Sequence, residues 1–339
     1  MLQIILAIVI AFLVVFLSIP RTIEILKEKG IIGVDVHKPN QPEVAKGGGF
    51  IVLFAIVAAL LVVIGFIRFQ AQEVNSGLLA ALVSILMAGM IGLLDDILDF
   101  NTRTKIVLPL IASIPMLVMQ VGTTTMSIPI IGTVDLGVIY PLVIVPLMMT
   151  FIIDSTNMYG GMNGLETGLA TINASSLLLY ILFAPLFTNV ENTSQLMDAG
   201  IVSGALLGAA LAFMFFNKCP ARILPGDVGR LPLGATMAAA LILGNMDRLA
   251  VILYIPFLIN FMLYLLYRIH VKRTRMEYIK FATPRNDGTL EVPGPFTMYW
   301  LLPYLSNGIT EKRNVILLLL LQAILAYGGV VILLFGIPF

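Results

Sequence analysis

Two adjacent aspartates, Asp95 and Asp96, stand at the end of an almost uncharged apolar segment, in the stretch GLLDDILDF. A carboxylate at the centre of a bilayer costs about 2.5 to 3.5 kcal/mol even on the lenient insertion scale, so this pair should lie at a polar boundary or in a cavity. Asp99 and Lys105 follow shortly afterwards. This mixture suits a carboxylate base, a metal ligand and a cation facing anionic oxygens. The alternative is an ordinary charged helix end in the headgroup region.

A second polar segment, DSTNMYGGMNGLETG from Asp154, contains Asn157, Asn163 and several glycines but no basic residue. Neutral amides and exposed backbone suit a nucleobase, a sugar or a metal-bound diphosphate. A helix cap is the alternative, although one Asn and one Gly would satisfy a cap.

A third segment, FNKCPARILPGDVG from Phe216, places Asp227 directly after Pro225 and Gly226. An acid on a rigid turn is a suitable Mg²⁺ ligand. The alternative is a surface salt bridge between Arg222 and Asp227.

A fourth segment, residues 268–313, is rich in cations, among them Arg273, Arg275 and Arg285. These can clamp phosphates or attract anionic lipid headgroups. The glycines at 47–49 lack the spacing of a known phosphate loop and are a weak signal. The four segments together contain acids, amides and cations but no Ser/His/Asp set, which favours Mg²⁺-dependent phosphoryl transfer over hydrolysis by a nucleophilic serine.

The elements that position these residues are membrane helices. The chain has 339 residues, of which 59% are hydrophobic and only 12% charged, and its mean hydropathy is +1.01. Such a composition predicts a polytopic membrane protein. The lone Cys219 excludes an intrachain disulfide, and the net charge of +1 argues against nucleic acid as a partner.

We expect an all-α fold with about ten transmembrane helices in a single integral-membrane domain, residues 1–339, because a span needs roughly 20 apolar residues. The predicted spans are 1–20, 48–67, 77–94, 105–121, 138–154, 166–187, 198–216, 231–245, 249–267 and 314–337. The first is too long for a signal peptide and is read as a retained helix.

Ten crossings leave five loops on one side: 21–47, 95–104, 155–165, 217–230 and 268–313, the last being the longest. With Lys105 at its helix boundary, they hold 18 of the 20 Lys and Arg residues. The positive-inside rule makes this side cytoplasmic and both termini extracytoplasmic. All four polar segments described above fall on that side, so the sequence predicts an active site formed by cytoplasmic loops.

The chain resembles the polyprenyl-phosphate N-acetylhexosamine-1-phosphate transferases, which are glycosyltransferases of family 4. The resemblance covers nearly the whole chain and lies in four ordered motifs: DDILD with Lys105, NMYGGMNGLETG, FNKCPARILPGDVG and NGITEKRNVILLLLLQ. Within this superfamily the chain is similar to the UDP-N-acetylglucosamine–dolichyl-phosphate N-acetylglucosamine-1-phosphate transferases of eukaryotes and archaea, and it looks like an archaeal member.

The resemblance implies a role for each matched residue. Asp95 and Asp96 would form the catalytic pair, and Lys105 would contact phosphate. Asn157 and Asp227 would hold Mg²⁺, or Mn²⁺ as a substitute, against the diphosphate. The residues that would bind substrate are Asn157, Asn163, Glu166, Arg222, Arg273, Arg275 and Arg285.

The reaction that the resemblance implies joins a UDP-sugar to a polyprenyl or dolichyl phosphate in the bilayer and releases UMP, in the first membrane step of glycan assembly. A one-step displacement and a covalent aspartyl intermediate both remain open, as does a homodimer. The location implied is the cell membrane of an archaeon or bacterium, or the endoplasmic reticulum of a eukaryote.

Two other classes of protein compete with this interpretation. An ion-coupled secondary transporter would place carboxylates near the bilayer midplane and use paired broken helices. A non-catalytic membrane scaffold would have no need of the motif-rich loops.

Overall fold

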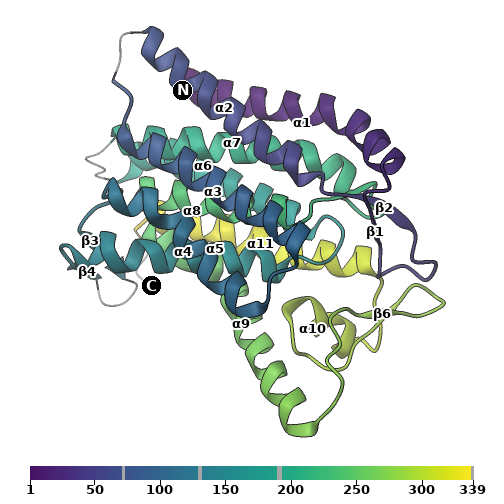
Figure 1. The fold of residues 1–339 in the computed structure, drawn as a ribbon. Coiled ribbons are helices and arrows are strands. Elements are labelled where there is room, and N and C mark those ends of the chain that lie inside the picture. Colours follow the sequence, from purple (N-terminus) through teal and green to yellow (C-terminus); the bar gives the residue numbers. More distant parts are fainter. Residues whose placement is uncertain (71–72, 129–131, 189–192, 337–339) are drawn as a thin grey trace.

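The computed structural model describes residues 1–70, 73–128, 132–188 and 193–336, and it is a bundle of helices (Figure 1). Among these described residues, eight segments are long and apolar enough to cross a membrane. They are α1 (Leu2–Glu28), α2 (Gly49–Phe69), α3 (Ser76–Leu98), Tyr140–Tyr159, α6 (Leu165–Phe187), α7 (Thr193–Asn217), α9 (Asp247–Thr274) and α11 (Glu311–Leu334). The fourth combines a π-helical turn, η1 (Tyr140–Ile144), with α5 (Val145–Tyr159). The chain is therefore a polytopic membrane protein.

Two of the ten predicted spans form shorter helices, α4 (Thr102–Val118) and α8 (Asp227–Leu243), with 17 residues each. At 1.5 Å per residue they are roughly 25 Å long, less than the hydrocarbon core of about 30 Å. The prediction of about ten spans therefore exceeds by two the number that length and composition support. Every residue of α8 from Leu231 to Leu243 is buried, which is typical of a helix surrounded by others.

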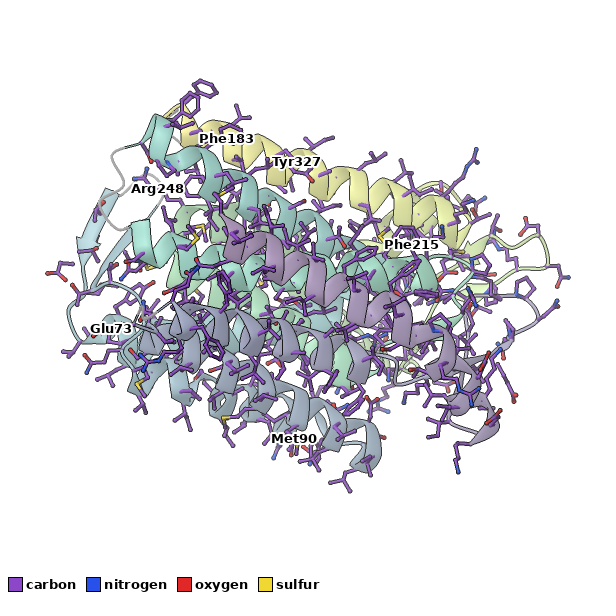
Figure 2. The ribbon with its side chains drawn as sticks, turned by 90° about the horizontal axis from the view of Figure 1, so that it is seen from above. Glu73, Met90, Phe183, Phe215, Arg248 and Tyr327 are labelled. Carbon is purple, nitrogen blue, oxygen red and sulfur yellow. The ribbon has the colours of Figure 1, made fainter. Side chains whose placement is uncertain are left out.

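Apolar side chains cover the outside of the bundle. Met90 is 56% exposed and Phe183 is 43% exposed, and both point outward in Figure 2. Figure 2 also shows Glu73 and Arg248 at the same end of the bundle, apart from each other. A surface apolar along its length and charged at its ends suits a bilayer.

The start of α1 and the end of α11 lie at the same end of the bundle, and the strands β1 (Ile32–Val34), β2 (Glu43–Lys46) and β6 (Thr283–Pro284) lie at the opposite end (Figure 1). The helices α1 to α9 and α11 therefore alternate in direction between these two ends. The end that carries β1 and β2 is called the motif end below.

The expectation of an all-α fold is wrong in detail, because the connections between helices contain short strands. At the motif end, β1 (Ile32–Val34) pairs antiparallel with β2 (Glu43–Lys46), which pairs parallel with β5 (Ile223–Leu224). A second sheet joins β3 (Thr125–Ile128) to β4 (Gly132–Asp135), and a third joins β6 (Thr283–Pro284) to β7 (Leu290–Glu291). Polar backbone groups outside helices need partners, and strand pairing supplies them.

The predicted long loop 268–313 is largely structured. Helix α9 continues to Thr274 and projects beyond the bundle (Figure 1), and α10 (Met298–Leu305) follows the β6–β7 pair.

Candidate active site

The predicted site residues gather on helix ends more than on loops. Asp95 and Asp96 lie in the last turn of α3, Asn157 lies in the last turn of α5, and Asp227 is the first residue of α8. The expected boundaries at residues 94 and 154 are therefore several residues too early. A helix satisfies its backbone hydrogen bonds internally, so it extends past its apolar stretch until a cap or a glycine ends it.

Close packing of α3 against α8 brings the aspartates together. A Cβ atom built on Gly92 would lie 2.3 Å from the carbonyl oxygen of Asp227, so only glycine permits this approach. The start of α2 packs equally closely, since a Cβ on Gly49 would lie 2.2 Å from the Cα of Gly229. The glycines therefore allow the ends of α2, α3 and α8 to meet at one place.

The carboxylate of Asp95 is buried and held from two directions. Its Oδ1 accepts the backbone N–H of Phe100 at 3.0 Å and lies 3.0 Å from Lys105 Nζ. The same ammonium lies 3.9 Å from Asp227 Oδ2 and 3.8 Å from Asp99. Lys105 thus stands among three carboxylates, and its role beside phosphate stays a prediction.

Asp96 caps a helix that belongs to another part of the chain. Its Oδ2 accepts the backbone N–H of Val228 at 2.9 Å, while the N-cap residue of α8, Gly226, has no side chain to do so. The first N–H groups of a helix lack intrahelical partners and favour a negative charge. The other oxygen of Asp96 lies 3.3 Å from Nζ of Lys46, a residue of β2 that sequence reasoning missed.

A second cation beside Asp227, besides Lys105, is Arg230, one turn later in α8. Its Nε donates to Glu166 Oε1 at 3.0 Å, and a terminal nitrogen lies 3.8 Å from Asp227 Oδ1. Arg222, by contrast, is exposed and stacks over the ring of Phe216 at 5.5 Å. The i, i+3 spacing of Asp227 and Arg230 was a sequence signal for this pair.

The carboxylates suit a divalent cation. Burial raises the pKa of the Asp227 carboxyl; the charge of Arg230 opposes this shift and the neighbouring Asp95 adds to it. A bound cation would stabilise the charged form of Asp227, which burial and Asp95 disfavour. Carboxylate oxygens are ligands that suit Mg²⁺. Asn157, the other predicted metal ligand, is half-buried in the last turn of α5, three residues before Gly160. A Cβ atom built on Gly160 would lie 3.4 Å from Arg230 Nε, so the end of α5 lies close to Arg230.

Asn163 lies in a separate polar group at the motif end, where it bonds to Asp35 and Glu311. Sequence reasoning assigned no role to Asp35, Lys38 or Glu311, although Glu311 lies within the motif NGITEKR.

The three arginines predicted from the long loop are not brought to the aspartates. Arg273 and Arg275 are exposed at the end of α9, the helix that projects from the bundle. Arg285 bonds within its own loop, to Glu291 at 3.3 Å and to the carbonyl oxygen of Asn307 at 2.9 Å. Within the described residues, no hydrogen bond or ion pair connects these arginines to Asp95, Asp96 or Asp227.

The glycine run at 47–49 serves a structural purpose. The N–H groups of Gly47 and Gly48 both donate to the carbonyl of Leu224 at 3.0 Å, and that of Gly49 donates to Pro225 at 2.9 Å. Because these donors are already engaged, the run is an entry turn into α2, which also fastens α2 to the segment before Asp227.

Comparison with known proteins gives a consistent identity. Residues 78–245, which contain the aspartates and Arg230, match the family model described as glycosyl transferase family 4. A Saccharolobus solfataricus protein with the provisional name UDP-N-acetylglucosamine–dolichyl-phosphate N-acetylglucosaminephosphotransferase is 31% identical, over 85% of this chain and 84% of its own length.

Two further relatives come from distant organisms. The Dictyostelium discoideum UDP-N-acetylglucosamine–dolichyl-phosphate N-acetylglucosaminephosphotransferase is 25% identical over 94% of this chain and 85% of its own length. A Streptococcus suis phospho-N-acetylmuramoyl-pentapeptide-transferase is 30% identical over 68% of this chain and 69% of its own. The chain therefore belongs to glycosyl transferase family 4, whose members named here transfer sugar phosphates.

Proposed function

We propose that the protein transfers N-acetylglucosamine-1-phosphate, or a related N-acetylhexosamine-1-phosphate, from a UDP-sugar to a polyprenyl or dolichyl phosphate. Family membership implies a metal-dependent membrane transferase using a UDP-sugar and a polyprenyl phosphate. The observation that carries the finer proposal is the meeting of Asp95, Asp96 and Asp227 with Lys105 and Arg230 at the motif end.

In the proposed reaction, an oxygen of the lipid phosphate attacks the β-phosphorus of the UDP-sugar in one step. The bond from that phosphorus to the bridging oxygen breaks, and UMP leaves. Mg²⁺, for which Mn²⁺ is a plausible replacement, would neutralise charge on the diphosphate and the leaving UMP. Asp227 and Asn157 would hold the ion.

The two proposed substrates are both anionic and therefore repel each other, and the cations of the site reduce this repulsion. Lys105 and Arg230 are each oriented by a carboxylate, Asp95 and Glu166 respectively. Such preorganised charges lower the repulsion between two phosphates and align the attacking oxygen. A phosphate with a second pKa of about 6 is largely ionised at neutral pH, so the reaction needs little help from a general base.

The carboxylates of Asp95 and Asp96 thus serve to orient the site in this proposal. Asp95 holds Lys105, and Asp96 holds the first turn of α8 through Val228. A base role for either remains a prediction, which separate Asn variants measured against pH would test.

The positive-inside rule supports a cytoplasmic motif end, with both termini on the other side of the membrane. We propose that α4 and α8 also traverse the membrane inside the shell formed by the longer helices, which completes ten crossings in a single domain. A transporter has less support, because the aspartates lie at helix ends and the chain belongs to a transferase family.

The test is transfer by purified protein in nanodiscs that contain polyprenyl phosphate. UDP-N-acetylglucosamine labelled in the β-phosphate should yield labelled lipid and an equal amount of UMP. EDTA should stop the reaction and added Mg²⁺ should restore it. A parallel assay with UDP-N-acetylgalactosamine distinguishes the sugar. Absence of UMP with every UDP-N-acetylhexosamine, with Mg²⁺ and lipid present, would refute the proposal.

A further inference from the structure

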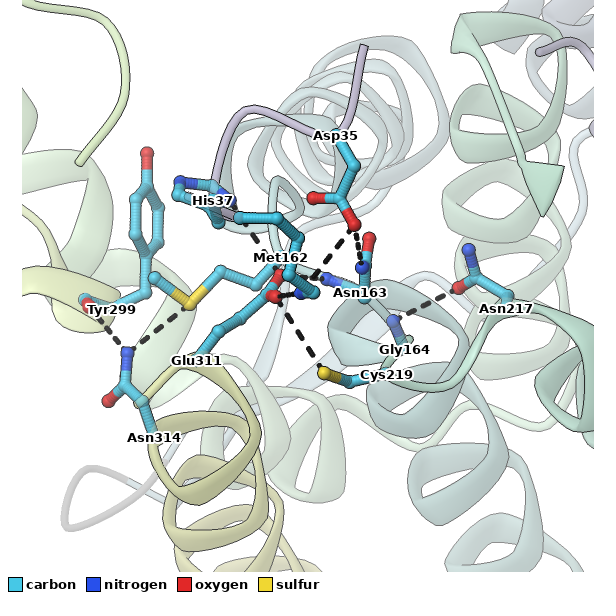
Figure 3. Close-up of polar contacts among 11 residues, drawn as sticks. Asp35, His37, Met162, Asn163, Gly164, Asn217, Cys219, Tyr299, Glu311 and Asn314 are labelled. Atoms are coloured by element: carbon cyan, nitrogen blue, oxygen red, sulfur yellow. Dashed lines mark hydrogen bonds and ion pairs between the residues drawn. The ribbon is translucent and has the colours of Figure 1, made fainter. Parts of the chain in front are cut away.

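A second polar cluster lies at the motif end, and Figure 3 shows its contacts. We call Asp35, Lys38, Asn163 and Glu311 the Glu311 cluster. Asp35 and Lys38 come from the β1–β2 connection, Asn163 from the α5–α6 connection, and Glu311 is the first residue of α11. Asp35, Asn163 and Glu311 are buried, with exposures of 4%, 6% and 3%.

Asn163 is held by both its backbone and its side chain. Its N–H donates to Glu311 Oε1 at 2.8 Å, and its Nδ2 donates to Asp35 Oδ2 at 2.7 Å. Because these acceptors come from two distant parts of the chain, the position of Asn163 depends on both. Charged acceptors make these bonds stronger than bonds between neutral groups.

Lys38 supplies the positive charge that two buried carboxylates require. Its ammonium pairs with Glu311 and lies 3.5 Å from Asp35 Oδ2. Burial lowers the pKa of Lys38, but the hydrogen bond to Glu311 and the charges of Glu311 and Asp35 raise it by more. Lys38 therefore stays charged when the cluster forms.

Two members of the cluster, Asp35 and Glu311, have the spacing of a metal site together with the neighbouring His37. One ligand atom of each residue lies within 4.8 Å of the others. The Lys38 ammonium, however, already contacts both carboxylates. A metal ion would have to displace it. The arrangement accordingly favours a structural role, in which the cluster holds the β1–β2 connection, the α5–α6 connection and the start of α11 together.

The turn that the cluster fixes leads directly into the candidate active site. Gly164, next to Asn163, has a φ of +79° and donates its N–H to Asn217 Oδ1 at 3.2 Å. Two residues further on, Glu166 bonds Arg230, which lies beside Asp227. The cluster therefore fixes the end of the α5–α6 connection, and through it the position of Glu166, which pairs with Arg230.

We propose that Glu311 is a positioning residue for the sugar nucleotide. Together with Lys38 and Asp35 it holds the Asn163 turn in the conformation that receives the uridine diphosphate portion of the substrate. This inference rests on the proposed function and on the substrate-binding role of Asn163 that the family resemblance implies. Glu311 itself touches no reacting atom, so its loss acts on substrate binding much more than on turnover.

The test compares Glu311→Gln with wild type. Glutamine keeps a carbonyl oxygen for the Asn163 N–H but removes the charge that pairs with Lys38. We expect KM for the UDP-sugar to rise about tenfold while kcat changes by less than about threefold, as the loss of a charged hydrogen-bond partner implies. The Kd of UDP-N-acetylglucosamine, measured by calorimetry without lipid acceptor, should rise by a similar factor.

Matched variants separate positioning from a general effect on folding. Asp35→Asn should give the same split between KM and kcat, because the Asn163 side chain loses a charged acceptor while Lys38 keeps Glu311 as its partner. Glu24→Gln removes an exposed glutamate from the pair with Arg21 at 2.7 Å, and it should leave KM and Kd unchanged.

The outcomes are distinguishable. Unchanged KM and Kd in Glu311→Gln and Asp35→Asn, with a lowered Tm alone, would overturn the inference and show a structural role. A fall in kcat at unchanged KM would overturn it as well. If wild type binds UDP-N-acetylglucosamine but releases no UMP, the proposed function fails. The Kd of UDP-N-acetylglucosamine for the variants still tests whether the Glu311 cluster positions the nucleotide.

Discussion

The carboxylate of Asp96 caps helix α8 by accepting the N–H of Val228 at 2.9 Å. The two residues belong to different motifs, 132 positions apart in the chain. The bond fixes the first turn of α8, and hence Asp227, relative to the end of α3. One of the two adjacent aspartates thus has an architectural task within the site.

Gly226→Ala should disrupt this relationship. Gly226 has a φ of +70°, and a Cβ there would lie 2.6 Å from Asp96 Oδ2. We expect a loss of transfer activity of tenfold or more, since small displacements in an active site are costly. The control is Gly30→Ala, where φ is +69° and no atom lies within 4 Å. That variant also places a side chain at positive φ, at a cost of about 1 to 2 kcal/mol, but it meets no neighbouring atom and should stay active. Equal losses of activity would contradict the clash argument.

Asp227→Asn should lower kcat by about a hundredfold or more, because the variant loses a charge from the proposed metal site. Initial rates of UMP release over a Mg²⁺ titration measure the effect. Asp99→Asn is the control: this carboxylate also lies near Lys105, at 3.8 Å, but its side chain is fully exposed. Wild-type activity of Asp227→Asn at limiting Mg²⁺ would show that the metal assignment is wrong.

The Mg²⁺ requirement should depend on pH. Burial raises the pKa of Asp227 in the metal-free protein, against the opposing charge of Arg230, so protons compete with the ion at a higher pH than for an ordinary carboxyl. As the pH falls through that raised pKa, Asp227 becomes neutral and the Mg²⁺ concentration for half-maximal activity should increase. Titrations from about pH 8 to about pH 5 would measure this trend. A constant Mg²⁺ requirement would argue against Asp227 as ligand.

The Glu166–Arg230 pair should show strong coupling in stability. Arg230→Met leaves the carboxylate of Glu166, which is 2% exposed, without its partner, and should cost about 3 to 5 kcal/mol. Adding Glu166→Gln should restore part of this loss. Unfolding measurements on the two single variants and the double variant give the coupling energy. The exposed pair Arg21–Glu24 serves as the reference, with an expected coupling below about 1 kcal/mol. Additive losses at 166 and 230 would contradict the buried-pair interpretation.

Much of the architecture was predictable because membrane helices are long apolar segments. All ten predicted spans correspond to helices. With Lys105 at its helix boundary, 18 of the 20 Lys and Arg residues fall in the five loops predicted to share one side of the membrane. Helix ends were less predictable: the expected boundaries at 94 and 154 gave way to ends at Leu98 and Tyr159. Hydropathy reports where lipid contact stops, whereas backbone hydrogen bonding decides where a helix stops.

Part of the candidate site was predictable, although the predicted arginines of the long loop lie elsewhere. Asp95, Asp96, Lys105 and Asp227 come together, but the arginine beside Asp227 is Arg230 instead of Arg222. Sequence distance could not select between two arginines on either side of one turn. The start of α8 decides it, because a helical turn places residues i and i+3 on one face.

The sequence by itself determined that this is a polytopic membrane protein with acids, amides and cations at one end, since composition and motif order are properties of the linear chain. Only the tertiary structure decided which charges neutralise which, for example that Lys38 and Asn163 meet Glu311. Those partners lie 273 and 148 positions apart. Such contacts depend on how closely helices approach, and here glycines at the helix contacts set that approach.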